Sequence, residues 1–357
     1  MQLFQDLFDR SKQYHQAPFQ SPLLHAQQGR YKIIHLAIKI PNLPAPLHYL
    51  NFYSMIGQPR AAIFQHPHLH IRQPLDVATV LVSSSVHSVG HFHAYDIAAE
   101  CHLNAQNFAF AQREKVLGNT QNFELLREDD ELCIRLQIQG LDLISYFYQL
   151  RWSLGQYWSI PCQCHGEVKY QGKTYPIQQL GVLEYARNIN FAYLPLAFYT
   201  YQLIPLSETQ QLIVLQLRDP LNSVIYSRLY LKNVVNKQLE IYDQGLYFKV
   251  TKLYPVVKTP NDQMMYLPRV FDWHLKNENL DVVIQGQSRG DFKFGLGAGF
   301  VGSFSYSAYI NGQVYTGEHA YIEYIDCRNL KYQESEHEKQ QACLSSEAIA
   351  VWRKLNN

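Results

Sequence analysis

Hydrophobic and polar residues alternate along this chain in short runs, and no long stretch shows the periodicity of a helix. In residues 132–150, for example, Ile134, Leu136 and Ile138 alternate with polar side chains, as in a half-buried strand. From residue 30 onward, runs rich in β-branched and aromatic residues recur between turn residues. Because these strands are not interleaved with long helices, the pattern predicts an all-β, mainly antiparallel fold of sandwiches or barrels.

The chain ends two of its parts in the same way. Residues 171–188 read QGKTYPIQQLGVLEYARN, and residues 311–329 read NGQVYTGEHAYIEYIDCRN. Each segment opens on a glycine turn, places a tyrosine three residues later, reaches Glu-Tyr and closes on Arg-Asn. Asn-Gly between two strand-like runs is a strong hairpin signal. The two glutamates, Glu184 and Glu323, are 139 positions apart, so the repeat indicates a duplicated domain and not a solenoid.

The two copies differ by one residue between the shared tyrosine and the shared glutamate. The separation is nine residues from Tyr175 to Glu184 and eight from Tyr315 to Glu323. One copy is therefore expected to absorb a residue in a β-bulge. The expected organisation is an N-terminal arm (1–29), a first β domain (30–190), a second β domain (191–330) and a C-terminal helix (331–357), with a short amphipathic helix inside the N-terminal arm.

Composition excludes several classes of function. The 357 residues carry a net charge of +1, only 17% are charged, and Tyr (26) and Phe (18) are abundant. A near-neutral chain has no electrostatic footprint for nucleic acid, and no apolar run is long enough for a spanning helix. The N-terminus does not read as a secretory signal and the six cysteines are scattered, so we expect a cytoplasmic protein with reduced thiols.

Histidine is the first candidate for chemistry. Two tracts carry alternating histidines: His66, His68 and His70, and then His91 and His93. On a strand, His91, His93 and Tyr95 share one face, and two such histidines with a third ligand can bind zinc. Pro67 interrupts the first tract, and histidine also suits polar interiors. We therefore expect no metal site, and place His91, His93 and Tyr95 among the candidate ligand-binding residues; a metal-dependent enzyme is the third alternative.

Cys162 and Cys164 form a Cys-x-Cys pair followed by a histidine. This spacing can hold a metal, but no matching second pair exists in the sequence. Buried packing of the two thiols is therefore the favoured interpretation.

The repeated glutamates are the candidate carboxylates. If their strands close two barrels, Glu184 and Glu323 are expected to face inward, and a buried carboxylate needs a partner. Arg187 and Arg328 are near in sequence, so a structural Glu-Arg pair in each copy is the favoured interpretation.

The alternative is catalytic. A desolvated carboxylate with a raised pKa could transfer a proton to or from an apolar ligand. Glu323, Glu184 and His319 are the candidate catalytic residues, and His319 and Tyr321 share the alternation parity of Glu323. Trp273 is a candidate for a large ring that shields a cavity. The expected ligand-binding residues are Trp273, Tyr321, Tyr324, Tyr185, His91, His93 and Tyr95.

The closing motifs resemble those of a known group of proteins. The segment GEHAYIEYIDCR (317–328) is similar to the ending of an uncharacterised bacterial branch of the double calycin proteins, which include AttH-like proteins and bacterial carotenoid hydratases. In the hydratase branch the corresponding strand resembles Gly-x-Gly-Tyr-x-Asp-His-Asn, whereas here Glu184 replaces the Asp and the His is absent. The resemblance implies two lipocalin-like barrels side by side and an apolar ligand.

These observations lead to two functional hypotheses. The first is binding of a lipid or isoprenoid-like molecule in a cavity of one barrel or at the interface of the two. The second is a hydratase, isomerase or cyclase on the same fold that acts on a polyene or lipid by carboxylate acid catalysis. Neither hypothesis requires an organic cofactor.

Overall fold

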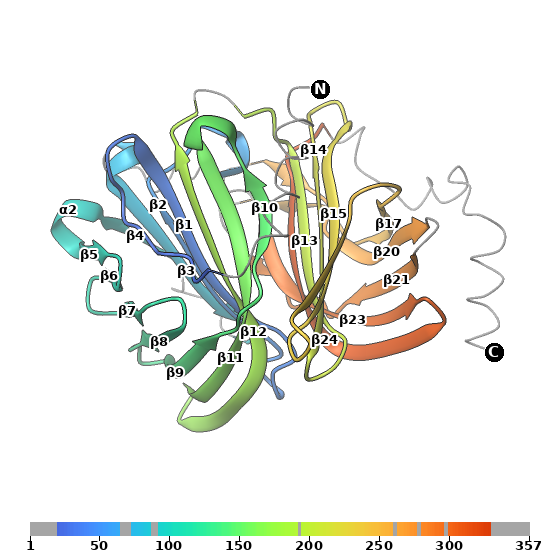
Figure 1. Cartoon of the computed structure of the whole chain (residues 1–357), viewed down its shortest axis with the longest axis horizontal. Helices are drawn as coiled ribbons and strands as arrows, with labels where there is room; N and C mark the ends of the chain where they lie inside the picture. The colour runs from blue at the N-terminus through green and yellow to red at the C-terminus, as the bar shows by residue number, and fades with distance from the viewer. Residues whose placement is uncertain are drawn as a thin grey trace.

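The structure is a computed structural model, and it describes residues 20–64, 73–86, 92–191, 194–259, 263–276, 280–295 and 299–329. These residues form two large antiparallel sheets that lie side by side (Figure 1). The prediction of an all-β, antiparallel fold is confirmed, and the architecture is that of two lipocalin-like domains in tandem.

The first sheet has twelve strands. Its order is β4 (Phe92–Asp96), β3 (Val77–Ser84), β2 (Leu50–Ile56), β1 (Tyr31–Ile40), β12 (Lys173–Ile189), β11 (Gly155–Tyr170), β9 (Leu132–Gly140), β8 (Asn122–Arg127), β7 (Glu114–Gly118), β6 (Asn107–Phe110) and β5 (Cys101–Asn104), and β10 (Ser145–Gln149) pairs with β11. A single helical turn, α2 (Ile97–Glu100), joins the two edge strands β4 and β5. Among the described residues, short 3₁₀ turns cover 62–64, 74–76 and 151–153.

The second sheet has ten strands. Its order is β16 (Gln238–Tyr242), β15 (Val224–Asn233), β14 (Gln210–Arg218), β13 (Phe198–Pro205), β24 (Gln313–Asp326), β23 (Phe300–Ile310), β21 (Asp281–Ser288), β20 (Pro268–Lys276) and β17 (Tyr247–Leu253), and β22 (Lys293–Phe294) pairs with β23. A separate pair is formed by β18 (Val257–Lys258) and β19 (Met264–Met265).

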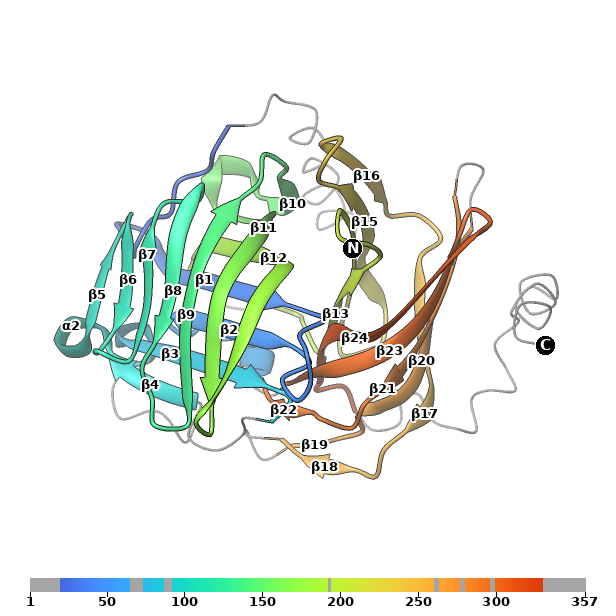
Figure 2. The ribbon, with the colours of Figure 1, turned by 90° about the horizontal axis from the view of Figure 1, so that it is seen from below.

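The two sheets share one topology. In the first, β12 lies between β1 and β11, and in the second, β24 lies between β13 and β23. The two strands that carry the repeated Glu-Tyr motif therefore occupy equivalent positions, as a duplication predicts. Figure 2 shows each sheet curling around its own interior. The first sheet ends at Ile189 and the second begins at Phe198, while the boundaries of the four expected segments stay predictions.

The hairpin tips agree with the sequence signals. Gln171 and Gly172 connect β11 to β12 with φ of 48° and 76°, and Asn311 and Gly312 connect β23 to β24 with φ of 46° and 88°. Two successive residues with positive φ are the requirement of a type I′ turn, which matches the twist of the flanking strands. Both predicted hairpins are confirmed.

The expected bulge is in the second copy. Pairing between β23 and β24 shifts register, because Tyr306 lies opposite Gly317 but Phe304 lies opposite Ala320. The extra residue of β24 reverses the side-chain parity at that point. As a result Tyr315 packs against the interior of the second sheet, whereas Glu323, only eight residues later, faces the opposite way. In the first copy Tyr175 and Glu184 are nine residues apart, an odd number, so they face opposite ways on a regular strand without a bulge.

Hydrophobic side chains form a core inside each sheet and a further cluster between the sheets. On β1, Leu36 and Ile38 point into the first core. The side chains that alternate with them point the other way, and Lys39 reaches Glu323 of the second sheet. The cluster between the sheets includes Tyr201 of β13, Tyr230 of β15 and Tyr321 of β24. The Tyr230 hydroxyl donates to the Tyr146 carbonyl at 2.9 Å, so the first sheet and the second are joined by polar as well as apolar contacts.

The described residues bear on several further predictions. Cys162 and Cys164 are both part of the first hydrophobic core, and burial raises the pKa of the Cys162 thiol to about 12, so the packing interpretation of this pair is confirmed. All five cysteines in these ranges are free. Within the same ranges no helix combines the length and hydrophobicity that crossing a membrane requires. The expected terminal helices lie outside the described residues.

Candidate ligand cavity between the two sheets

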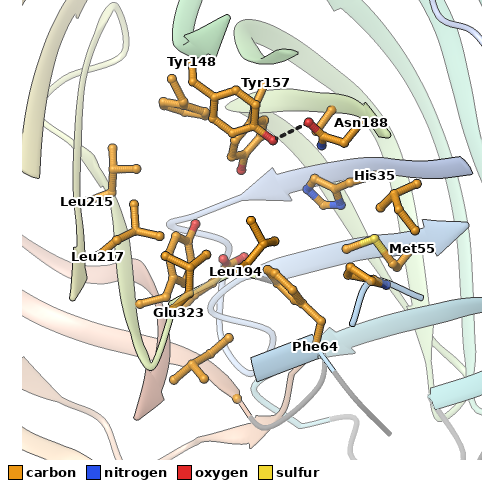
Figure 3. A pocket seen from close by; sticks show the side chains of 18 of the residues that line it. His35, Met55, Phe64, Tyr148, Tyr157, Asn188, Leu194, Leu215, Leu217 and Glu323 are labelled. Atoms are coloured by element: carbon orange, nitrogen blue, oxygen red, sulfur yellow. Dashed lines mark hydrogen bonds between the residues drawn. The ribbon is translucent and has the colours of Figure 1, made fainter. Parts of the chain in front are cut away.

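A cavity of about 370 Å³ lies between the two sheets, outside both sheet interiors. Figure 3 shows Met55 and Phe64 on the side of the first sheet and Leu215 and Leu217 on the side of the second. Leu194, from the segment that links the sheets, also lines the cavity. The walls are mainly hydrophobic because the residues on the facing sides of both sheets are largely apolar.

The polar groups of the cavity are few. His35 of β1, Tyr157 of β11 and Glu323 of β24 point into it, and Tyr148 lies beside Asn188 (Figure 3). The Tyr148 hydroxyl donates to Asn188 Oδ1 at 2.9 Å. Among the described residues that line the cavity there is no lysine or arginine. Glu323 is therefore the one lining residue with a side chain that is ordinarily ionised at neutral pH.

A buried lysine joins the two repeated glutamates behind this polar region. Lys39 of β1 places its Nζ 2.8 Å from Glu184 Oε2 and 2.9 Å from Glu323 Oε1. Lys39 and Glu184 have fully buried side chains, and 9% of the Glu323 side chain is exposed. One ammonium from the first sheet thus neutralises only part of the charge of two carboxylates, one from each sheet.

Two expectations about these glutamates are wrong. They do not face into the sheet interiors: Glu184 lies opposite Ala37 of β1 and Glu323 lies opposite Tyr201 of β13, on the faces that meet between the sheets. Each interior is a continuous apolar core, whereas a carboxylate needs a charged or hydrogen-bonding partner.

Nor are the partners arginines. Arg328 pairs with Asp326 at 2.7 Å, and the Arg187 guanidinium lies 4.2 Å from the centre of the Tyr31 ring. The two glutamates share Lys39 instead, which arrives from a strand that neither repeated segment contains.

Aromatic residues complete the network. The Tyr157 hydroxyl donates to Glu184 Oε2, and the Tyr321 hydroxyl donates to Glu323 Oε1 at 2.9 Å. Lys39 Nζ lies 3.8 Å from the centre of the Tyr201 ring, within the range of a cation–π interaction. The predicted shared face of Tyr321 and Glu323 is confirmed by their hydrogen bond.

Burial and charge act in opposite directions on the ionisation of this network. Burial favours the neutral form of Glu184, but the Lys39 ammonium and the hydrogen bonds from Lys39 and Tyr157 outweigh it and hold the pKa of Glu184 well below its ordinary value. Burial likewise opposes the charge of Lys39, but both glutamates raise its pKa. The shift at Glu184 is opposite to the one that a proton donor at neutral pH requires.

Glu323 is the member of the network that reaches the cavity. Its Oε1 accepts from Lys39 and Tyr321. Its Oε2 has no hydrogen-bond partner among the described residues, and Glu323 lines the cavity (Figure 3). Because Lys39 and Tyr321 both contact Oε1 and neither lines the cavity, we infer that Oε2 is the oxygen nearer to it. The site therefore presents an available carboxylate oxygen to a mainly apolar space.

Comparison with known proteins assigns this chain to a family. A family of unknown function (DUF6670) matches residues 53–341. The chain belongs to this family. A search of curated protein sequences found no match.

Solved structures show the fold of this DUF6670 chain in other proteins. A putative AttH from Nitrosomonas europaea has 13% sequence identity and a TM-score of 0.56, and the similarity covers 87% of this chain and 99% of that one. Kievitone hydratase from Nectria haematococca has 10% identity and a TM-score of 0.51, covering 83% and 89%. The fold is therefore that of the AttH-like, hydratase-like double calycin proteins, as the closing motifs indicated.

Several predicted ligand-binding residues of the DUF6670 chain lie away from the cavity. Trp273 and Tyr324 belong to the core of the second sheet, where the Trp273 indole donates to Gln202. Tyr185 belongs to the first core, and its hydroxyl donates to the His25 carbonyl at 2.9 Å. Tyr321 lies between the sheets but contacts Glu323 from behind the cavity wall.

The histidine strand is also separate. The Tyr95 hydroxyl donates to Glu114 Oε2 at 2.7 Å inside the first sheet, and His93 contacts the Arg113 guanidinium. His91, with His66, His68 and His70, lies outside the described residues. The described ranges contain no group of three or more His, Cys, Asp or Glu arranged to hold a metal ion.

His319 contacts the loop between β1 and β2 but does not line the cavity. Its ring stacks on His48 with centroids 3.9 Å apart, and His48 Nδ1 lies 3.6 Å from Asp291 Oδ2. Burial, followed by the charges of His48 and Arg289, lowers the pKa of His319 to about 4. A catalytic role for His319 stays a prediction.

Sequence reasoning missed Lys39, His35 and Tyr157. A signal for Lys39 was present, because it is the one ionised side chain inside the apolar strand sequence IIHLAIKI (33–40), and buried lysines need partners. The distance along the chain between Lys39 and either glutamate concealed the pairing.

Proposed function

We propose that this protein binds one hydrophobic small molecule in the cavity between its two sheets. The observation that carries the proposal is a cavity of about 370 Å³ with apolar walls and a few convergent polar groups. Ligand sites typically measure about 300–1,000 Å³ and have this composition.

The positions of the side chains orient the ligand. Its apolar part packs between Met55 of the first sheet and Leu215 and Leu217 of the second. Its polar end lies toward His35 and Glu323. A lipid or isoprenoid-like molecule has this division between a long apolar part and one polar end.

The test blocks the cavity from one wall. Ala186 of β12 lines the cavity and lies in register between His35 and Tyr157, so Ala186→Phe projects a ring into the space. The matched control is Ala105→Phe, the same substitution at an exposed position of the β5–β6 turn. Decanol is expected to raise the melting temperature of the native protein and of the control, because a ligand stabilises the state that binds it, but not that of Ala186→Phe.

An equal shift in all three proteins would contradict binding in this cavity. Leu217→Trp fills the same space from the second sheet and should give the same result as Ala186→Phe. Native mass spectrometry of the folded variants checks the outcome independently, since a bound ligand adds its mass to the native protein and to the control only.

A second candidate is a lyase or isomerase reaction in the same cavity. The observation that favours it is Glu323 Oε2, a carboxylate oxygen without a described partner that faces an apolar space. A carboxylate in such a position can accept a proton from a bound substrate. In this second candidate Glu323 accepts the proton, and Glu184, whose lowered pKa disfavours its protonated form, is not the proton donor. One of the fold neighbours is a hydratase by name.

Glu323→Gln separates the two candidates. A polyene or an alcohol incubated with the native protein is analysed for isomers and for gain or loss of water. Conversion by the native protein that Glu323→Gln abolishes, with the ligand still bound, supports the enzyme. Binding without any conversion by the native protein supports the binding protein alone.

A further inference from the structure

We propose that the cavity selects neutral ligands whose polar end donates a hydrogen bond, as an alcohol or a phenol does, and rejects carboxylates of the same chain length. The proposal rests on the proposed function and names the chemical class of its ligand. It follows from the distribution of charge around the polar end of the cavity.

The first argument is the absence of a counter-ion. No lysine or arginine is among the described residues that line the cavity. Lys39 is fully buried behind the wall and is already paired with Glu184 and Glu323 at 2.8 and 2.9 Å. Two carboxylates share this one ammonium, so the surroundings of the polar end carry net negative charge. An anionic headgroup placed there would be desolvated, unpaired and repelled.

Lys232 interacts with Glu184, but burial lowers the pKa of Lys232 to about 7, so this side chain is mostly uncharged at pH 8. It is fully buried in β15, and its Nζ lies 3.3 Å from Ser159 Oγ. It does not line the cavity, so a bound headgroup has no contact with it.

The second argument is the supply of acceptors. Glu323 Oε2 faces the cavity without a described partner, while its Oε1 is occupied by Lys39 and Tyr321. A ligand hydroxyl that donates to this oxygen makes a charge-assisted hydrogen bond, which is stronger than a neutral one.

His35 adds to the same preference. Its Nδ1 lies 3.1 Å from the Ser54 carbonyl, which can only accept, so Nδ1 carries a proton. In the tautomer with its proton on Nδ1, Nε2 is an acceptor. His35 Nε2 lies 4.0 Å from Glu184 Oε2, beyond hydrogen-bond distance.

The tyrosine and asparagine donors of the lining carry no charge. The Tyr148 hydroxyl already donates to Asn188, and the Tyr157 hydroxyl already donates to Glu184. Other tyrosine hydroxyls of the lining are neutral and supply no counter-charge. The polar end is therefore matched to a donor and is poorly matched to an anion.

Three probes with one chain length test the proposal: decanol, methyl decanoate and decanoate. Their dissociation constants for the native protein are measured by isothermal titration calorimetry at pH 8, where decanoate is ionised. Decanol is expected to bind at least about tenfold more tightly than decanoate, a difference of about 1.4 kcal/mol. Methyl decanoate, neutral but without a donor, should bind less tightly than decanol and more tightly than decanoate.

Two variants assign the effect to Glu323. Glu323→Gln removes the charge with little change in shape and is expected to reduce the preference for decanol over decanoate. The control is Glu318→Gln on the same strand, where the glutamate is exposed and pairs with Arg289; it should leave the three constants unchanged. Circular dichroism melts establish that each variant is folded, and the comparison of the three probes on the native protein does not depend on either variant.

Decanoate binding as tightly as decanol to the native protein would overturn the selectivity while leaving the binding function intact. An equal change of preference in both variants would also overturn it. Failure of all three probes to bind would overturn the proposed function and this inference together.

Discussion

Removing the shared ammonium of Lys39 tests whether the buried network holds the two sheets together. Lys39→Met keeps most of the side-chain volume and leaves Glu184 and Glu323, formerly 2.8 and 2.9 Å from Nζ, without their common partner. Breaking a buried ion pair by removing one member costs about 3–5 kcal/mol, because the remaining charge stays buried and uncompensated. We expect a loss of this size in the free energy of unfolding at pH 7.

An exposed ion pair of equal length provides the control. Lys237 Nζ lies 2.8 Å from Asp142 Oδ2, but the two side chains are 62% and 47% exposed. Pairs of this kind contribute about 0–1 kcal/mol, so Lys237→Met should have a small effect. Urea denaturation followed by tryptophan fluorescence measures both variants, and it reports on both sheets because Trp158 and Trp273 are buried in the first and second cores.

The pH dependence supplies a second check with a definite sign. The pKa of Glu184 in the folded protein is held below its ordinary 4.5, so its stabilising contribution is fully present above pH 4.5 and is lost as the pH falls further. In Lys39→Met the buried carboxylates are instead disfavoured as anions, and protonation relieves them. The stability difference between the native protein and the variant should therefore shrink below about pH 4.5. Equal losses for Lys39→Met and Lys237→Met at pH 7 would refute the reasoning.

Two further predictions concern basic side chains whose pKa values are lowered in the folded protein. Burial, only partly offset by Glu184 and Cys162, lowers the pKa of Lys232 from 10.5 to about 7. The unfolded chain therefore binds more protons between these values, and Lys232→Met should raise the free energy of unfolding, with a larger gain at pH 6 than at pH 10 by chemical denaturation. The pKa of His319 is lowered from 6.5 to about 4, so folded His319 resists protonation across this window. The native protein should lose more stability than His319→Gln on acidification from pH 6.5 to pH 4 in thermal melts, and parallel losses would contradict this assignment.

The fold was predictable because its signals are local. Strand alternation, the Gln-Gly and Asn-Gly tips and the one-residue difference between the copies each act within a few residues. Together they predicted the hairpins and a bulge in one of the two copies, which the structure places in β24. The candidate site was only partly predictable. The motif singled out Glu184 and Glu323, but alternation alone does not say which face of a strand is covered by its own sheet and which by a neighbour.

The remaining site residues depend on tertiary structure. Lys39 reaches Glu184 because β1 pairs with β12, and it reaches Glu323 because the second sheet packs against that face. The spacing of Lys39, Glu184 and Glu323 along the sequence does not indicate either contact. Trp273 was expected at a cavity, but a large apolar ring satisfies the core of the second sheet equally well. The presence of a large aromatic residue in the sequence does not show whether it lines a cavity or packs in a core.

The most direct test of the account is the position of a bound ligand. A decanol analogue with bromine at the end of its chain can be soaked into crystals, and the anomalous signal of bromine then locates the apolar end. The account predicts one bromine peak between Met55 and Leu215, with the hydroxyl of the ligand beside Glu323. A peak inside either sheet, among the core residues around Phe52 or Trp273, would contradict a ligand site between the sheets.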